Sequence, residues 1–297
     1  MDSWITLAIA AAAFQTLRFV LQKQLSMGTL STGGATFARF AYSAPLVATG
    51  AVVYLLHAGQ IPAGFNLRFW GFGLAGGLAQ ILATWCMVAL FAQRNFAVGI
   101  TFKKTEVVQT ALVGLVLLGD RISMAGLGAI LTGLVGVLIL SGGVGAERWN
   151  VMNRAAGLGL LAGALFALSA VGYRGATLEI VSDDPFMRAL TTLAIVTISQ
   201  AVGMALWLRW RETGQVGCVF QARRRAIWMG VTGLGGSLCW FTAFTIQNAA
   251  YVFAVGQVEV IFSLAASVLI FGERLTRREA VGIALITASV IAVALFR

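Results

Sequence analysis

The chain has 297 residues, of which 59% are hydrophobic and 11% are charged, and its mean hydropathy is +0.88. This composition excludes a soluble globular domain and indicates an integral membrane protein. The formal net charge of +10 does not indicate a nucleic-acid partner, because the arginines lie at helix ends and within apolar segments rather than in a soluble basic patch.

Long apolar runs joined by mostly short connections predict an all-α polytopic membrane protein with ten transmembrane helices, since about 20 apolar residues cross a bilayer as a helix. The runs are continuous rather than alternating, which argues against the strands of a membrane barrel. The first run lacks a preceding basic region and a cleavage site, so we expect a mature helix rather than a removed signal. The predicted helices span residues 3–25, 33–56, 69–92, 96–118, 122–141, 155–177, 186–208, 226–247, 250–271 and 279–296.

The first predicted helix carries Gln15, Arg18 and Gln22 at positions i, i+3 and i+7, which lie on one helical face. Polar and charged side chains within a membrane helix face the bundle interior or a water-filled space. We therefore predict that these three side chains line a polar path and contact a substrate.

The fourth predicted helix carries Lys103, Lys104 and Glu106 near its middle. A charge at that depth costs about 2.5 to 3.5 kcal/mol on the insertion scale, so these side chains face protein or water rather than lipid. Together with Arg18, the two lysines predict a cationic site for a carboxylate or phosphate. Lys104 points about 100° away from Lys103 around the helix, so an interhelical salt bridge is the alternative for Lys104.

The two halves of the chain resemble each other. GDRIS at 119–123 corresponds to GERLT at 272–276, the same shift carries Glu106 onto Glu259, and Gly76 and Gly77 correspond to Gly235 and Gly236. We predict two five-helix repeats, over residues 1–145 and 150–297. Because five is odd, the second repeat enters the membrane from the opposite side, and such inverted repeats place a substrate site near the midplane.

Glu106 and Glu259 are candidates for proton-linked gating. Burial disfavours a charged carboxylate, so a carboxyl group in a low-dielectric site can take a proton near neutral pH. The alternative is structural: Glu106 neutralises Lys103, and Glu259 bonds to backbone or to an arginine such as Arg39. No cation lies three residues before or four residues after Glu259, which predicts an unpaired and protonated carboxyl group there.

Arg39 and Arg188 occupy corresponding places early in the second helix of each half, and we assign them a gating or structural role that involves a glutamate or a helix C-terminus. Gln257 stands where the first half has Lys104, so we assign it to substrate selectivity. Among the aromatic residues, Trp85, Tyr173, Trp240 and Tyr251 can stack on a substrate ring, and core packing is the alternative.

No catalytic centre, metal site or cofactor is expected. The cysteines, Cys86, Cys218 and Cys239, show no ligand spacing, and the single histidine, His57, lies at a helix end. The sequence therefore offers neither the histidine-based site nor the acidic clusters for metal-bound diphosphates that a membrane enzyme would need.

The turns LLGDRIS and IFGERLT, the arginine early in each second helix and the two halves of five helices resemble the drug/metabolite transporter superfamily, EamA type. The resemblance covers nearly the whole chain and implies a multi-pass secondary transporter of the bacterial inner (plasma) membrane. The family commonly has a proline in its fourth and ninth helices. Here Val107 and Val260 follow the glutamates, which weakens the expectation of a kink.

The interpretation is a secondary transporter that moves a small polar metabolite bearing a carboxylate or phosphate by alternating access, with proton coupling or exchange left open. An amino-acid exporter and a lipid-translocating protein remain as alternatives. The expected partners are a small-molecule substrate and the lipid bilayer, without nucleic acid, in a monomer or homodimer. Most loop arginines lie in 142–154, 209–225 and 274–278, which predicts that these loops are cytoplasmic and that both termini are outside.

Overall fold

The computed structural model describes residues 2–26, 30–91, 102–141, 154–262, 265 and 276–296. Helices make up nearly all of this part, and the one β-type contact within it is an isolated bridge between Ala63 and Val181. The first part of the chain forms α1 (Ser3–Ser26), α2 (Thr32–Ala58), α3 (Leu67–Phe91), α5 (Glu106–Leu118) and α6 (Met124–Ser141). The second part forms α7 (Arg154–Glu179), α8 (Pro185–Arg211), α9 (Gln215–Gln221), α10 (Arg223–Ile246), α11 (Ala249–Gly256) and α13 (Arg277–Phe296).

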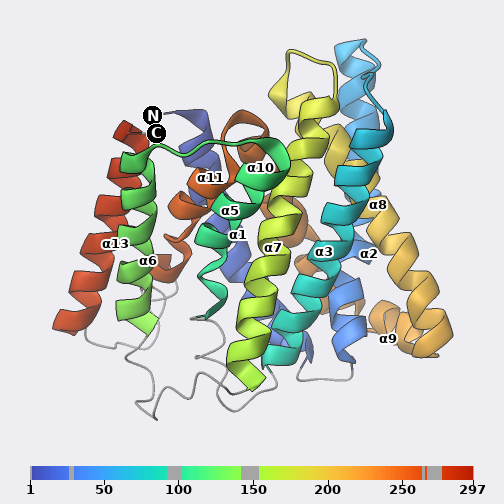
Figure 1. Cartoon of the computed structure of the whole chain (residues 1–297). Coiled ribbons are helices and arrows are strands. Elements are labelled where there is room, and N and C mark those ends of the chain that lie inside the picture. The colour runs from blue at the N-terminus through green and yellow to red at the C-terminus, as the bar shows by residue number, and fades with distance from the viewer. Residues whose placement is uncertain are drawn as a thin grey trace.

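Eight of the ten predicted segments agree with the observed helices to within a few residues. The other two, 96–118 and 250–271, are only partly described, because residues 92–101, 263–264 and 266–275 lie outside the described part of the structure, and within that part they give the shorter helices α5 and α11. The structure also has one addition. The connection predicted at 209–225 contains the short helix α9, which lies at the opposite end of the bundle from the two chain ends (Figure 1). Within the described residues, five helices are long and apolar enough to cross a membrane, namely α2, α3, α7, α8 and α10. Large apolar side chains such as Leu56, Val116 and Leu206 are exposed on the outer surface, which is the arrangement that a surrounding lipid phase requires.

The fourth and ninth segments are broken, although neither has a proline at the break. Helical backbone at Phe102–Lys103 gives way to a turn at residues 104–105 before α5 begins at Glu106, and α11 ends at Gly256 before a turn at residues 257–258. At each turn the backbone bond spans three residues rather than four: Thr105 N donates to Phe102 O at 3.2 Å and Val258 N donates to Val255 O at 3.2 Å.

Two local features favour the break in the fourth segment. The Thr105 hydroxyl donates to the Phe102 carbonyl at 2.7 Å, which competes with the regular helical bond to that carbonyl. The carboxylate of Glu106 then stands in the first turn of α5, where the helix dipole favours negative charge. The two breaks stand directly before Glu106 and Glu259, the glutamates that correspond in the two halves of the sequence.

The end of α5 explains the GDRIS motif. Gly119 has φ +69, a left-handed conformation that favours glycine. Its N–H donates to the Leu115 carbonyl at 3.2 Å, and the Asp120 N–H donates to the Gly114 carbonyl at 3.1 Å. The glycine therefore stops the helix and places Asp120 directly beyond it.

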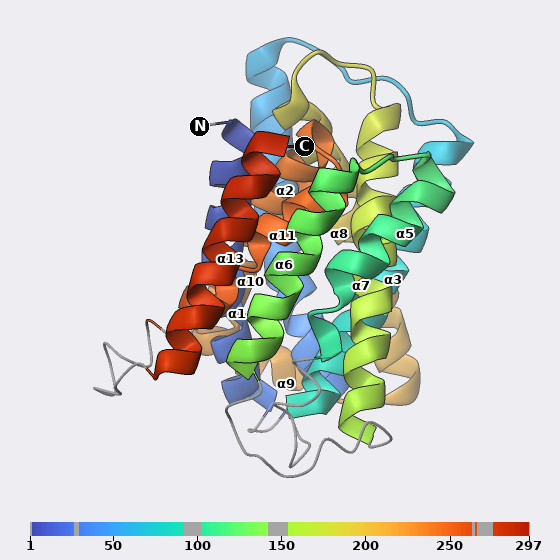
Figure 2. The same ribbon diagram turned by 60° about the vertical axis from the view of Figure 1, so that its left-hand side comes forward.

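The helices pack in pairs that join the two halves of the chain. α3 lies against α7, α1 against α10, α2 against α8 and α6 against α13; the last pair stands side by side at one edge in both views (Figures 1 and 2). Glycines allow the closest approaches. A Cβ atom on Gly172 of α7 would lie 2.9 Å from the Gly76 Cα and 2.9 Å from the Phe72 carbonyl oxygen of α3.

We predict that Gly172→Ala lowers the melting temperature of the purified protein, because the added methyl group meets backbone atoms that cannot move aside; such overpacking costs about 1–3 kcal/mol. Gly157→Ala in the same helix is the matched control, since nothing lies within 4 Å of its Cβ position. There the change is expected to be neutral or stabilising, by about 0.5–1 kcal/mol. Equal melting temperatures for the two variants would refute the close contact.

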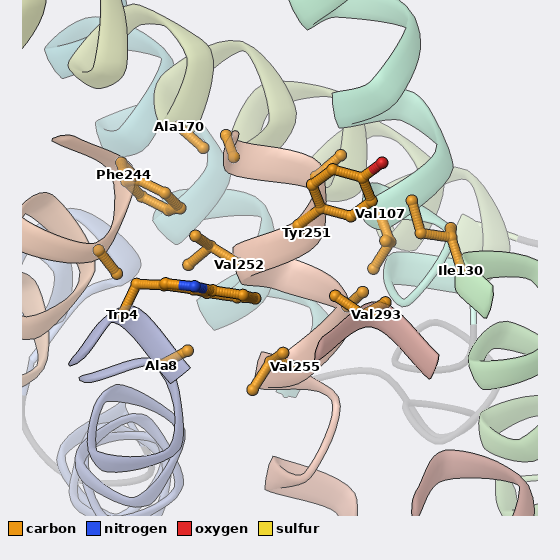
Figure 3. Packing of buried hydrophobic residues seen from close by; sticks show 14 of the residues in the cluster. Trp4, Ala8, Val107, Ile130, Ala170, Phe244, Tyr251, Val252, Val255 and Val293 are labelled. Carbon is orange, nitrogen blue, oxygen red and sulfur yellow. The ribbon is translucent and has the colours of Figure 1, made fainter. Parts of the chain in front are cut away.

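The largest buried apolar cluster surrounds α11. Figure 3 shows the Trp4 indole on one side of this helix, beside Val252, and Tyr251 on the other side, toward Val107 and Ile130. The Tyr251 hydroxyl accepts a bond from the Ser123 N–H at 3.2 Å. The cluster therefore holds the short, broken ninth segment between α1, α5 and α6.

Candidate functional site

The candidate site is a cavity enclosed by α1, α2, α3, α7, α10 and α11. Its volume, including space that is open to solvent, is about 380 Å³. Its lining residues are Gln15, Arg18, Arg39, Gln80, Phe166, Ser169, Ala170, Tyr173, Ser237, Trp240, Phe241, Phe244 and Phe253. Of the residues that the sequence analysis singled out, five are in this lining: Gln15, Arg18, Arg39, Tyr173 and Trp240.

Arg18 reaches the cavity from α1 and is only 3% exposed. Its Nη2 lies 3.5 Å from Gln15 Oε1, at the outer limit of a hydrogen bond, and its guanidinium carbon lies 4.7 Å from the centre of the Phe19 ring. Its Nη1 is buried and has no hydrogen-bond partner among the residues that the structure describes. A buried guanidinium nitrogen without an acceptor is costly, so Arg18 is set up to receive one.

Arg39 reaches the same cavity from α2 and is 5% exposed. It donates from Nη1 to Thr84 Oγ1 and from Nη2 to Ser237 Oγ, each at 3.2 Å. These acceptors are neutral hydroxyl groups, so the predicted pairing of Arg39 with a glutamate is not observed. A Cβ atom on Gly233 would lie 3.4 Å from Arg39 Cγ and 3.8 Å from Arg18 Cδ, which shows that both side chains cross α10 at one point.

The lysines that the sequence assigns to the substrate lie outside the cavity lining and are engaged in buried ion pairs. Lys103 Nζ lies 2.6 Å from Glu106 Oε1, as the spacing of the two residues predicts. Lys104 Nζ lies 2.9 Å from Glu259 Oε2, which joins the fourth segment to the ninth directly at their two breaks. The interhelical salt bridge that was the alternative for Lys104 is therefore present.

Glu259 is thus paired, and the prediction of an unpaired, protonated carboxyl group there was wrong. Its Oε2 also accepts a bond from Gln15 Nε2 at 2.9 Å. The sequence showed no cation near Glu259 because Lys104, its partner, is 155 positions away along the chain. A hydrogen-bonded path therefore runs from Lys104 through Glu259 and Gln15 to Arg18 at the cavity wall.

The charges around the site leave a net positive cavity. Lys103 and Lys104 are each neutralised by a glutamate, whereas neither Arg18 nor Arg39 pairs with a carboxylate in the described residues. No aspartate or glutamate is among the residues that line the cavity. The arrangement favours an anionic ligand, because buried cations require a partner of opposite charge.

Aromatic side chains make up much of the rest of the cavity lining. The Trp240 and Phe244 rings of α10 stack with centres 5.6 Å apart and planes at 15°, and Phe253 of α11 meets both edge-on at 5.3 Å. From α7, Tyr173 packs against Phe241 with ring centres 4.2 Å apart. The Tyr173 hydroxyl donates to Gln80 Oε1 at 2.9 Å and accepts from Gln200 Nε2 at 3.2 Å.

The remaining predicted residues lie elsewhere. Trp85 packs edge-on against Trp207, with ring centres 4.9 Å apart, in a cluster outside the cavity lining. Arg188 bonds through Nε to the Thr177 carbonyl at 2.8 Å. Gln257 is 2% exposed, and neither side-chain amide atom has a hydrogen-bond partner among the described residues. The side chain of Gln22 is outside the described part of the structure.

Sequence reasoning missed Gln80, Ser237 and the phenylalanines of the lining. Gln80 is a single polar residue in the apolar segment of α3, and Ser237 directly follows the glycine pair of α10. Both were detectable as polar residues inside membrane segments. The phenylalanines carried no such signal, because apolar rings also fill the core and the lipid-facing surface.

A third ion pair joins helices at the end of the bundle where the chain ends lie. Arg174 Nε lies 2.9 Å from Asp120 Oδ2, and Arg174 Nη1 donates to the carbonyls of Phe244 and Gln247 at 2.7 and 2.9 Å. Arg174 of α7 thereby connects the acid of the GDRIS motif, at the end of α5, to the end of α10 at cavity residue Phe244.

Comparisons with known proteins support the family resemblance of the sequence. Residues 153–295 match the sequence profile of the EamA-like transporter family. A solved structure, described only as a crystal structure of a protein, superimposes with a TM-score of 0.66 at 17% identity, over 97% of this chain and 99% of its own. At that identity the likeness shows the fold alone. No curated protein matches. The profile match covers slightly less than half of the chain. It supports the resemblance of the turns and helices to EamA-type transporters, and together with the long apolar helices it indicates a multi-pass membrane protein.

Proposed function

We propose that this chain is a secondary transporter of small organic anions and that it binds the carboxylate or phosphate group of its substrate between Arg18 and Arg39. The observation that carries the proposal is the presence of two buried arginines in one cavity, without a carboxylate partner in the described residues. Arginine binds carboxylate and phosphate groups with directed, charge-assisted hydrogen bonds. Lys103 and Lys104 then support the site from behind and do not contact the substrate.

We also propose that the two halves, 1–145 and 150–297, are inverted repeats that move against each other to open the cavity to alternate sides. Two observations support this. The first long helix of each half packs against the third long helix of the other half: α1 lies against α10, and α7 lies against α3. The second helices, α2 and α8, pack against each other, and so do the last helices, α6 and α13. The breaks also fall directly before corresponding glutamates. Broken helices at a repeat interface are typical of transporters that work by alternating access.

In this proposal Glu106 and Glu259 act in gating, because each carboxylate holds a lysine at a break in a membrane helix. Gln15 bonds to Glu259 and lies next to Arg18. A substrate that binds Arg18 therefore changes the contacts of Gln15, and through them those of Glu259 in the ninth segment. Neutralisation of each glutamate by a lysine favours substrate exchange over proton coupling as the driving step. We place the protein in a bacterial inner membrane with its arginine-rich loops in the cytoplasm, as the positive-inside rule predicts.

An amino-acid exporter is the competing proposal. A zwitterion brings an ammonium group, which needs an acceptor that is preferably a carboxylate when it is buried. The described cavity lining offers only neutral oxygen atoms, such as those of Gln80, Ser169 and Ser237. The charge of the site therefore favours an anion over a zwitterion.

Counterflow in proteoliposomes tests the proposal. Vesicles that contain the full chain are loaded with unlabelled compound, and uptake of the labelled form is measured for lactate, succinate, glucose 6-phosphate and glucose. We expect accumulation of at least one anion and none of glucose. Uptake of glucose without uptake of any anion would contradict the proposal, as would the translocation of labelled lipid without exchange of any solute.

A further inference from the structure

The cavity lining contains two chemically different sets of side chains, which come from different helices. The cations are supplied by α1 and α2 through Arg18 and Arg39, whereas Trp240, Phe244 and Phe253 come from α10 and α11. A ligand that satisfies both sets therefore has an anionic group and an apolar face.

The aromatic set is already ordered. Trp240 and Phe244 are one helical turn apart, their planes differ by only 15°, and Phe253 stands nearly perpendicular to both, at 75° and 88°. Trp240 and Phe244 stack on each other and Phe253 meets both edge-on, so the three rings form a packed aromatic corner in which Trp240 is the broadest ring. Aromatic rings prefer offset-stacked and edge-to-face contacts of this kind, so the corner fits a flat ring better than a hydrated chain.

The polar groups of the lining are largely committed to protein partners. Gln80 Oε1 accepts bonds from Tyr173 and Gln200, Ser237 accepts from Arg39, and Gln15 donates to Glu259. A sugar would therefore lose water from several hydroxyl groups without finding replacement bonds, which is costly. By contrast, Nη1 of Arg18 is buried and has no partner among the described residues, which leaves it for one anionic group.

We infer that the substrate is an aromatic monocarboxylate without an ammonium group. Its carboxylate binds Arg18 and Arg39, and its ring packs into the corner of Trp240, Phe244 and Phe253. This inference rests on the proposed function and narrows its substrate class. The cavity volume of about 380 Å³ is compatible with a ligand of a single ring.

Four probes of nearly one shape test the inference in proteoliposomes that contain the full chain. Mandelate carries a phenyl ring, a hydroxyl group and a carboxylate. Lactate replaces the ring by a methyl group, phenylglycine replaces the hydroxyl group by an ammonium group, and mandelamide replaces the carboxylate by a neutral amide. We expect mandelate counterflow to exceed that of each of the other three at least tenfold, since about 1.4 kcal/mol of ring contact or charge pairing corresponds to a factor of ten.

The two proposals fail in different ways. Equal rates for lactate and mandelate would overturn the aromatic substrate class but leave the anion transporter in place. Phenylglycine exchange as fast as that of mandelate would overturn the exclusion of an ammonium group. Exchange of mandelamide without exchange of mandelate or lactate would contradict the anion transporter itself.

A variant locates the ring. Trp240→Leu is expected to bring the ratio of mandelate to lactate exchange down toward one, because it removes the broadest ring of the corner. Trp240→Phe, which keeps an aromatic ring, should retain most of the ratio, and this variant controls for an effect of Trp240→Leu on folding. The matched control is Trp85→Leu, since Trp85 packs against Trp207 away from the cavity; it should leave the ratio unchanged. A ratio that survives Trp240→Leu would overturn the placement of the ring.

Discussion

Replacing Arg18 with methionine is expected to reduce anion exchange at least tenfold at subsaturating substrate. Methionine keeps the unbranched apolar stem but removes the charge and the buried Nη1, which has no partner in the described protein. A hydrogen bond to a charged group contributes about 1.5–3 kcal/mol, which corresponds to roughly 10- to 150-fold in affinity. Initial rates of mandelate counterflow over a range of concentrations measure the effect as an increase in KM.

Arg188→Met is the matched control for Arg18→Met. Arg188 donates from Nε to a backbone carbonyl, that of Thr177, outside the cavity lining. Its replacement should leave the KM for mandelate near that of the wild type. If Arg18→Met and Arg188→Met changed the KM alike, Arg18 would be a structural residue and the site would have to lie elsewhere.

Replacing Lys104 with methionine is expected to destabilise the protein strongly. Glu259 would keep its bond from Gln15 but lose the only lysine within ion-pairing distance in the described residues. The Lys104 and Glu259 side chains are only 4% and 10% exposed. Breaking a buried pair from one side costs about 3–5 kcal/mol, because it leaves an uncompensated charge. The melting temperature in detergent measures the loss.

The double variant Lys104→Met, Glu259→Gln distinguishes a charge effect from a packing effect. Removal of both charges should recover much of the lost stability, since no buried ion then remains without a partner. If the loss of stability in the double variant equalled the sum of the losses in the two single variants, Lys104 and Glu259 would not interact. The single change Glu259→Gln, which leaves Lys104 unpaired, should also lower the melting temperature.

Local pattern in the sequence accounts for most of the helices. Apolar runs of the right length predict the membrane segments, and the similar turns of the two halves are the basis for the proposed repeat. The contact between Lys103 and Glu106 was predictable because three residues bring two side chains to one face of a helix. Each of these features depends only on neighbours along the chain.

Features that depend on packing between distant helices were not predictable in the same way. The contact of Lys104 with Glu259 depends on how the fourth and ninth segments meet, and the breaks that precede Glu106 and Glu259 occur without a proline. Arg39 and Arg188 occupy corresponding sequence positions, yet only Arg39 reaches the cavity. Likewise, nothing in the apolar pattern separates Trp240, which lines the cavity, from Trp85, which packs against Trp207.

The central claim is that an anion binds between Arg18 and Arg39, and thermal stabilisation of the purified chain by matched ligands tests it most directly. A ligand at 100 times its dissociation constant adds about 2.7 kcal/mol of stability. We predict that mandelate raises the melting temperature of the wild type and of Arg188→Met, that mandelamide does not, and that the difference vanishes in the double variant Arg18→Met, Arg39→Met. Equal stabilisation by mandelate and mandelamide, or a difference that persists in the double variant, would contradict the account.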